Sequence, residues 1–211
     1  MTSRVIPSAA AGFLAAEAVI AGLIVANMRP LLLPVTADLS GGITLTAVNL
    51  GTAVVVLLAF AALCQGAAVL WPTPVIRWVE WSQVSGVTVF LLAQLNGIRD
   101  VATLVALYAL TAGASLFLVL HERVGAGRWP FALGAAVGIV PWGVIAFYQI
   151  GAIVVGESPD LLIRVITVAM LAVSVVYWLA AFHCRRAGSA HPVLIAISVS
   201  VFAWLVVGLP N

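Results

Sequence analysis

The chain has 211 residues, of which 64% are hydrophobic and 8% are charged, and its mean hydropathy is +1.22. Soluble domains carry about a quarter charged residues, so this composition excludes a soluble globular domain and predicts a protein surrounded by lipid. The net charge is +2 and the basic residues are scattered, which excludes a phosphate-binding surface for nucleic acid. Cys64 and Cys184 have no CxxC or Cys/His cluster nearby, so neither a disulfide framework nor a metal site is expected.

Seven nearly uncharged runs follow one another along the chain, each close to the roughly 20 residues that a helix needs to cross a hydrocarbon core. The runs are continuously apolar rather than alternating, which favours helices over the strands of a barrel. We therefore predict an all-α membrane protein, with a single domain over residues 1–211 that forms a bundle of seven transmembrane helices. The predicted spans are residues 8–28, 47–70, 79–98, 101–120, 129–155, 161–182 and 191–209.

The arginines predict the orientation of the bundle. On the side of the N-terminus lie Arg4, Arg77, Arg123, Arg128, Arg185 and Arg186, and on the other side lie Arg29, Arg99 and Arg164. The positive-inside rule then places the N-terminus in the cytoplasm and the C-terminus outside. The first run is longer than the roughly 7 to 15 residues of a signal-peptide core, so we interpret it as a retained helix.

No lysine occurs anywhere in the sequence, and all nine basic residues are arginines. A composition rich in alanine, valine and arginine is typical of a GC-rich genome. We therefore expect an integral protein of the cytoplasmic membrane of a GC-rich bacterium.

Glu80 lies near the start of the third predicted span, and Gln83, Val87 and Gln94 share its helical face. An ionisable group inside a span is costly and is a candidate for function. One interpretation makes Glu80 a counterion, a proton site or a cation ligand. The other makes it an interfacial carboxylate close to Arg77, and the spacing alone does not decide between them.

Glu17 lies midway along the first span, where it must be protonated or hydrogen-bonded within the bundle. Gln65 and Asn49 are its expected partners, and its role is either functional or that of a structural hydrogen bond between helices. The three histidines, His121, His183 and His191, all fall at span ends and are interpreted as interfacial.

Trp142, Trp178 and Trp204 lie deeper in their spans than the other tryptophans, where they either line a cavity or fill the core. The sequence contains no glycine-rich phosphate loop, no nucleophile elbow and no HExxH motif. We therefore do not expect an enzyme.

Several segments resemble one family. The third span opens with Arg77-Trp78-Val79-Glu80-Trp81-Ser82 and ends in residues 93–100, Ala-Gln-Leu-Asn-Gly-Ile-Arg-Asp, which is similar to the third helix and following turn of heliorhodopsins. Residues 138–142, Gly-Ile-Val-Pro-Trp, resemble their fifth helix, and Ala203-Trp204 resembles the end of their seventh. The resemblance implies a seven-helix bundle with a cytoplasmic N-terminus, often a homodimer, in which a lysine of the seventh helix carries retinal and Glu80 is the counterion.

The resemblance places Val199 where the retinal-bearing lysine should stand, between Ser198 and Ser200. A Schiff base needs a primary amine, and the guanidinium of arginine cannot replace it. The sequence therefore predicts that retinal is not bound covalently. The connection between the first two spans is also expected to be shorter than the extended loop of the family.

The leading hypothesis is a heliorhodopsin-like protein that has lost light sensing, does not pump ions, and acts as a regulatory or apolar-ligand-binding protein. Its ligand is expected to be free retinal, a carotenoid fragment or a lipid, held without a covalent bond. A homodimer, surrounding lipid and a soluble cytoplasmic partner facing Arg123, Arg128, Arg185 and Arg186 are the expected partners. The expected pocket consists of Glu80, Gln83, Trp142, Trp178, Val199 and Ser200.

Two alternatives remain at this point. The first is a proton or ion conductor that uses Glu80, Glu17 and Gln94 as relay points. The second is a membrane enzyme acting on a lipid or a carotenoid, for which the sequence offers no nucleophile and base at a suitable spacing.

Overall fold

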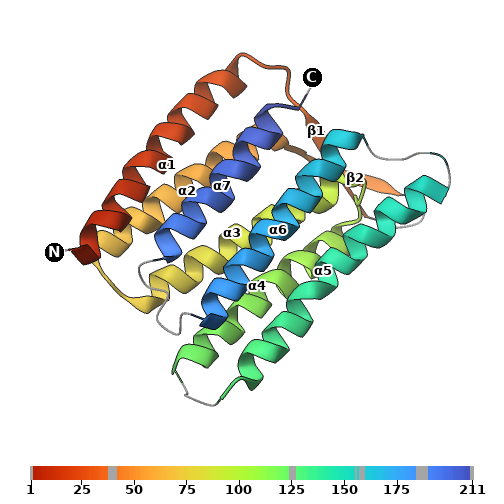
Figure 1. Cartoon of the computed structure of the whole chain (residues 1–211). Helices are drawn as coiled ribbons and strands as arrows, with labels where there is room; N and C mark the ends of the chain where they lie inside the picture. Colours follow the sequence, from red (N-terminus) through yellow and green to blue (C-terminus); the bar gives the residue numbers. More distant parts are fainter. Residues whose placement is uncertain are drawn as a thin grey trace.

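The computed structural model of the chain describes residues 2–37, 42–123, 127–154, 156, 160–183 and 190–209. Seven helices confirm the helical bundle that the sequence predicts, and Figure 1 shows them side by side. They are α1 (Thr2–Ala26), α2 (Leu50–Leu70), α3 (Pro74–Leu95), α4 (Val101–Arg123), α5 (Trp129–Val154), α6 (Leu161–His183) and α7 (His191–Val207).

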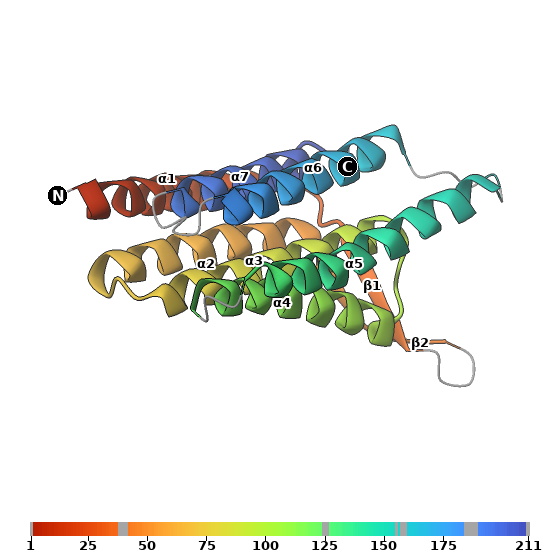
Figure 2. The ribbon, with the colours of Figure 1, turned by 60° about the horizontal axis from the view of Figure 1, so that its bottom comes forward.

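The helices form two layers. Figure 2 shows α1, α7 and α6 in one layer and α2, α3 and α4 in the other, with α5 beside α4. Along the chain, α1 packs on α2 and α4 packs on both α3 and α5, whereas α6 makes only sparse contact with α5. Helix α3 contacts α2, α4 and α7, and most of its residues are buried. Its polar side chains therefore lie in the interior of the bundle.

Local sequence signals set where several helices begin. Asn49 caps α2, because its side-chain oxygen accepts a hydrogen bond from the backbone N–H of Thr52 at 3.3 Å. Proline occupies the first turn of α3 and of α7, where its missing N–H costs nothing. The starts of α3 and α7 are thereby fixed by Pro74 and Pro192.

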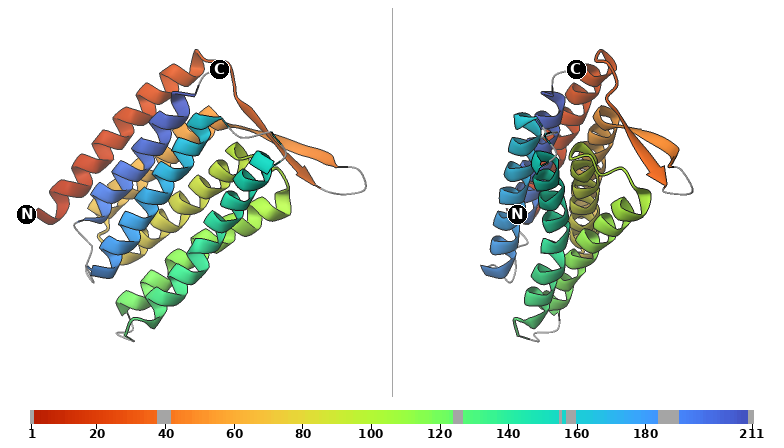
Figure 3. Two further views of the ribbon diagram at one scale, coloured as in Figure 1. Left: turned by 45° about the vertical axis from the view of Figure 1, so that its right-hand side comes forward. Right: turned by 90° about the vertical axis from the view of Figure 1, so that its right-hand side faces the viewer.

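An antiparallel hairpin, which the sequence analysis missed, connects α1 to α2. Strand β1 (Leu32–Ala37) pairs with β2 (Ile43–Asn49), and the hairpin projects beyond the helices (Figure 3). The second helix accordingly begins at Leu50 rather than at residue 47. The signal is present in the sequence, because the segment from Thr44 to Val48 alternates β-branched and other residues shortly after a Gly-Gly pair.

Strand β1 is attached to the turn between α3 and α4. The N–H of Thr36 donates to the carbonyl of Arg99 at 2.8 Å. In the same turn, Asp100 accepts hydrogen bonds from the backbone N–H and the hydroxyl of Thr103, each at 2.8 Å, and so caps α4. These bonds to the charged form hold the pKa of Asp100 below its ordinary value of 3.8.

Among the described residues, five helices are long and apolar enough to cross a membrane: Arg4–Ala26, Leu50–Leu70, Val101–His121, Trp129–Val154 and Leu161–Phe182. Helix α7 is apolar but shorter, with 17 residues. Helix α3 is not in this set, which reflects the polar residues along it.

Candidate functional site

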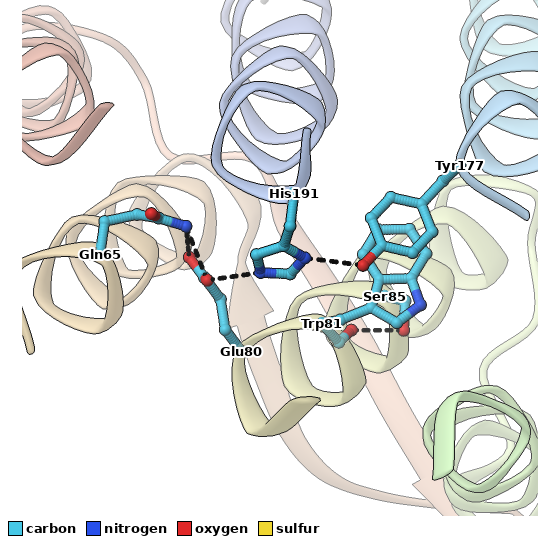
Figure 4. A network of polar contacts seen from close by, with 6 residues as sticks. All are labelled: Gln65, Glu80, Trp81, Ser85, Tyr177 and His191. Carbon is cyan, nitrogen blue, oxygen red and sulfur yellow. Dashed lines mark hydrogen bonds and ion pairs between the residues drawn. The ribbon is translucent and has the colours of Figure 1, made fainter. Parts of the chain in front are cut away.

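Three polar side chains from three helices meet at the end of the bundle where α3 and α7 begin. Glu80 lies in the second turn of α3, Gln65 near the end of α2, and His191 at the start of α7. The side-chain amide of Gln65 donates to the two carboxylate oxygens of Glu80 at 2.8 and 2.7 Å, and His191 Nε2 lies 3.0 Å from Glu80 Oε2 (Figure 4). All three are at most 3% exposed, so the cluster is an internal polar site rather than an interfacial one.

The cluster continues into the bundle through Tyr177 of α6. The hydroxyl of Tyr177 lies 2.7 Å from His191 Nδ1, and its ring stacks on the indole of Trp81 with centroids 3.3 Å apart. If Glu80 is ionised, Nε2–H donates to it and Nδ1 accepts from Tyr177. A protonated Glu80 would donate to Nε2 instead. The Glu80–His191 pair therefore accommodates one proton on either partner.

A cavity of about 230 Å³ lies beside this cluster. Its polar wall includes Gln65, Glu80, His191, Arg77 and Thr73, and much of the remainder is formed by prolines. The guanidinium of Arg77 also lies over the ring of Trp78, 4.9 Å from its centroid. The cavity is several times the volume of a water molecule, which is about 30 Å³ in the liquid.

Glu17 belongs to a different polar contact. Its carboxylate accepts a hydrogen bond from the indole N–H of Trp204 at 2.7 Å and another from the hydroxyl of Ser200. The expected pairing of Glu17 with Gln65 or Asn49 is therefore wrong, because Gln65 binds Glu80 and Asn49 caps α2. Glu17 connects α1 to α7, which satisfies a buried carboxylate through a helix-to-helix contact.

The space at the centre of the bundle is nearly closed. A cavity of about 20 Å³ remains between α3, α4, α5, α6 and α7, with Trp81, Trp142, Met170, Ser174 and Ser198 in its wall. Val199 is buried in the hydrophobic core next to Ser198. This volume holds about one water molecule, so the centre has no room for a retinal-sized molecule.

A larger apolar groove of about 150 Å³ lies between α5 and α6. Trp142 and Trp178 line it, together with Gly138, Ile139, Ser174 and other small or aliphatic residues. Trp178 approaches α5 closely because Gly134 has no side chain: a Cβ there would lie 2.9 Å from the indole. Trp142 and Ser174 line both the groove and the central cavity, so they form a shared wall between the two.

The six predicted pocket residues therefore do not lie together in one pocket. Glu80 belongs to the polar cluster, Trp142 and Trp178 to the groove, and Val199 to the core. Gln83 accepts a hydrogen bond from the hydroxyl of Tyr108 on α4, and Ser200 donates to Glu17. Glu80 and Gln83, which share the predicted polar face of α3, therefore have different partners on different helices. The side-chain amide of Gln94, on the same face, is buried and has no hydrogen-bond partner among the described residues.

Sequence analysis missed His191, Gln65 and Tyr177 as members of the site. His191 was expected at the interface, which is wrong, because its side chain is 3% exposed and contacts Glu80. Pro192 signals that a helix begins here, but nothing in the sequence near residue 191 indicates a buried partner on α3. Of the arginines predicted to face a partner, Arg128 lies over the ring of Phe182, while Arg185, Arg186 and the side chain of Arg123 lie outside the described residues.

The sequence model of the family described as heliorhodopsin matches residues 35–208, which is most of the chain. The chain therefore belongs to the heliorhodopsin family and is a membrane protein with a rhodopsin-like helical bundle, as the resemblance predicts. No curated protein matches the chain.

Proposed function

We propose that this member of the heliorhodopsin family is a light-independent, non-pumping membrane protein that binds an apolar ligand without a covalent bond and acts in regulation. The chain has no lysine to form a retinal Schiff base, and the residue at the expected position, Val199, is buried in the core. Heliorhodopsins are rhodopsin-like photoreceptors and not a family of enzymes, which agrees with a binding role.

The observation that carries this proposal is the groove between α5 and α6. It is apolar, it is lined by two tryptophans, and it adjoins the nearly closed centre through Trp142 and Ser174. Aromatic and aliphatic walls favour a flat apolar molecule such as retinal, a carotenoid fragment or a lipid chain. The few contacts between α5 and α6 allow the groove to widen around such a ligand.

All-trans-retinal is a suitable probe, because quenching of tryptophan fluorescence reports its binding near Trp142 and Trp178 without a Schiff base. Ala135 lines the groove, whereas its neighbour Ala136 is exposed and does not. We expect Ala135→Phe to weaken quenching at least tenfold and Ala136→Phe, the matched control, to leave it unchanged. Equal quenching in both variants contradicts the proposal.

We further propose the topology that the arginines indicate: seven spans in the cytoplasmic membrane, with the N-terminus in the cytoplasm and the C-terminus outside. In this orientation the Glu80 cluster and its cavity lie toward the cytoplasm, where a soluble partner has access to that end of the bundle. We also propose that the protein forms a homodimer. Cysteine labelling from each side of intact membranes tests the orientation.

A proton conductor is the second candidate, and the Glu80–His191 pair beside a cavity favours it. The pair accommodates a proton on either partner, and the hydrogen bond to Tyr177 extends it inward. Glu17, in contrast, has its own partners on α7 and does not contact this pair. If the protein conducts protons, we expect the wild type to carry protons into liposomes and Glu80→Gln to abolish this flux. Absence of proton flux in the wild type rules out a conductor.

A further inference from the structure

We infer that Asn96, together with Gln149 of α5 and Thr167 of α6, forms a hydrogen-bonded bridge that limits how far the groove between α5 and α6 opens to admit a ligand. The role in ligand entry rests on the proposed function, whereas the link between the two helices does not. Three features of the structure support the bridge: the size of the groove, the contacts at its two ends, and the attachment of Asn96 to α3.

The first feature is the size of the groove. Its volume is about 150 Å³, whereas pockets for drug-sized ligands usually have about 300–1,000 Å³. A ligand as large as retinal therefore fits only if α5 and α6 move apart. Direct contact between these two helices is sparse, so the groups that join them at the ends of the groove determine how easily they separate.

The second feature is the contact at each end of the groove. At the end near the start of α5, the ring of Phe131 packs against Trp178 and Phe182 of α6, with centroids 5.4 and 4.7 Å apart. Trp178 also approaches Gly134 of α5, where a Cβ would lie 2.9 Å from the indole. This end is therefore held by the packing of aromatic rings.

At the opposite end, hydrogen bonds through Asn96 join the two helices. Gln149 lies about two turns beyond Trp142 on α5 and donates from Nε2 to Asn96 Oδ1 at 2.7 Å. Asn96 Nδ2 in turn donates to the hydroxyl of Thr167 at 3.0 Å. Single hydrogen bonds between membrane helices contribute little to stability, so we expect the groove to widen from this end first.

The third feature is the attachment of Asn96 itself. Asn96 ends α3 and is 6% exposed, and its Nδ2 also donates to the carbonyl of Leu92 at 2.8 Å. Both N–H groups and the oxygen of the side-chain amide thus have partners, which defines its orientation. The turn that follows is bound to β1 through Thr36 and Arg99. The bridge is therefore anchored on α3, and α5 and α6 are the helices that move relative to it.

The geometry has two consequences. Separation of α5 and α6 at this end lengthens at least one of the two bonds to Asn96, so the bridge lowers the population of the open arrangement and with it the apparent affinity for a large ligand. Because both bonds pass through one side chain, loss of either bond uncouples the helices as fully as loss of both. A residue that only stabilises the fold would lower the melting temperature without changing the spacing of α5 and α6.

The test measures this spacing in the full-length, ligand-free protein in phosphatidylcholine nanodiscs. Nitroxide labels on Phe147→Cys of α5 and Val165→Cys of α6, both exposed positions, report the distance between the helices by double electron–electron resonance. Cys64 and Cys184 are replaced by alanine in this labelled parent, so that only the two chosen positions react.

We expect a narrow distance distribution in the labelled parent and a mean distance several ångströms longer in Asn96→Leu. Gln149→Leu and Thr167→Val, which each remove one bond of the bridge, should give the same increase, and their double variant should give no more. Asn27→Leu is the matched control, because the side chain of Asn27 donates to the carbonyl of Leu23 within α1. This control should leave the distance unchanged.

The rate at which all-trans-retinal quenches tryptophan fluorescence then tests ligand entry. Asn96→Leu should speed the association of retinal several-fold, whereas Asn27→Leu should not change it. A longer distance with an unchanged association rate overturns the role of the bridge in ligand entry.

An unchanged distance in Asn96→Leu overturns the bridge, even if the melting temperature falls. Increases that add in the double variant of Gln149→Leu and Thr167→Val also contradict it, because the two bonds would then act independently. If Asn96→Leu does not fold, these two single variants decide, since Thr167→Val keeps the shape of the side chain. Absence of retinal quenching in the wild type overturns the proposed function alone, because the distances are measured without a ligand.

Discussion

The imidazole of His191 lies 3.0 Å from the carboxylate of Glu80, although 111 residues separate the two in sequence. The resemblance to heliorhodopsins gives Glu80 a positively charged partner on the seventh helix, the protonated Schiff base. The same resemblance places Val199 at the position of that lysine, whereas the first residue of the seventh helix, His191, presents a nitrogen to the carboxylate. A partner for Glu80 is thus retained without a lysine.

We predict that His191→Leu destabilises the protein by about 1–3 kcal/mol, because it removes the imidazole that contacts the buried carboxylate of Glu80 and leaves Gln65 as its hydrogen-bond partner. Thermal unfolding in nanodiscs measures the change. The double variant with Glu80→Gln should lose less than the sum of the two single variants, since neither charge then remains unpaired. Additive losses would show that the two side chains are not coupled.

Val199→Lys alone should not produce a retinal pigment. The cavity at the centre of the bundle is about 20 Å³, so a new lysine has no space beside it for the chromophore. The visible absorption spectrum of the variant, recorded after retinal is added to its membranes, shows whether a pigment forms. An absorption band well to the red of free retinal would show that the centre opens, and that Val199 stands at a usable attachment position.

Gly134→Ala should destabilise the protein by about 1–3 kcal/mol, because Phe117 of α4 and Trp178 of α6 leave no room for a methyl group at this position of α5. The new Cβ would lie 2.8 Å from Cβ of Phe117 and 2.9 Å from the indole of Trp178. Gly143→Ala is the matched control, since no atom lies within 4 Å of a Cβ there. Equal melting temperatures for the two variants would contradict the close packing of α4 and α6 around Gly134.

Trp204→Phe should cost about 1–3 kcal/mol, because it removes the indole N–H that donates to the buried Glu17. This cost should add to that of His191→Leu, since the two contacts share no residue. A double-mutant cycle in the same unfolding assay tests the additivity. A coupling well above about 0.5 kcal/mol would mean that the two polar contacts communicate.

Asp100 should make stability depend on pH in the acidic range. Its pKa is lowered in the folded protein by hydrogen bonds from Thr103, so its contribution is complete above the ordinary value of 3.8 and is lost as the pH falls through the lower folded pKa. Comparison of the acid unfolding of the wild type and Asp100→Asn isolates this contribution. The difference between them should shrink as the pH falls below 3.8, and a growing difference would contradict the assignment.

The order and approximate bounds of the helices could be predicted from the sequence because apolar length alone specifies a membrane-spanning helix. Glu80 and Glu17 could be identified for the same reason, since each stands out in an apolar run. Their partners could not be identified. Ser200 and Trp204 lie more than 180 residues from Glu17, and only the packing of α1 on α7 brings them together.

His191 illustrates the same limit at a helix end. The end of an apolar run predicts an interfacial residue, but whether it faces lipid, water or the bundle depends on the rotation of α7 against α3. The Tyr177–Trp81 stack likewise depends on the placement of α6. The hairpin is different, because the alternating residues of β2 already indicate a strand in the sequence.

The bond between Thr36 and Arg99 has a mechanical consequence. Helix α3 carries Glu80 near one end, and the other end leads into the turn that β1 holds. Its 22 residues make it a rigid rod of roughly 33 Å at 1.5 Å per residue. A tilt of α3 at Glu80 would therefore be transmitted through this rigid helix to the turn after it, and from there to the hairpin at the opposite end of the bundle.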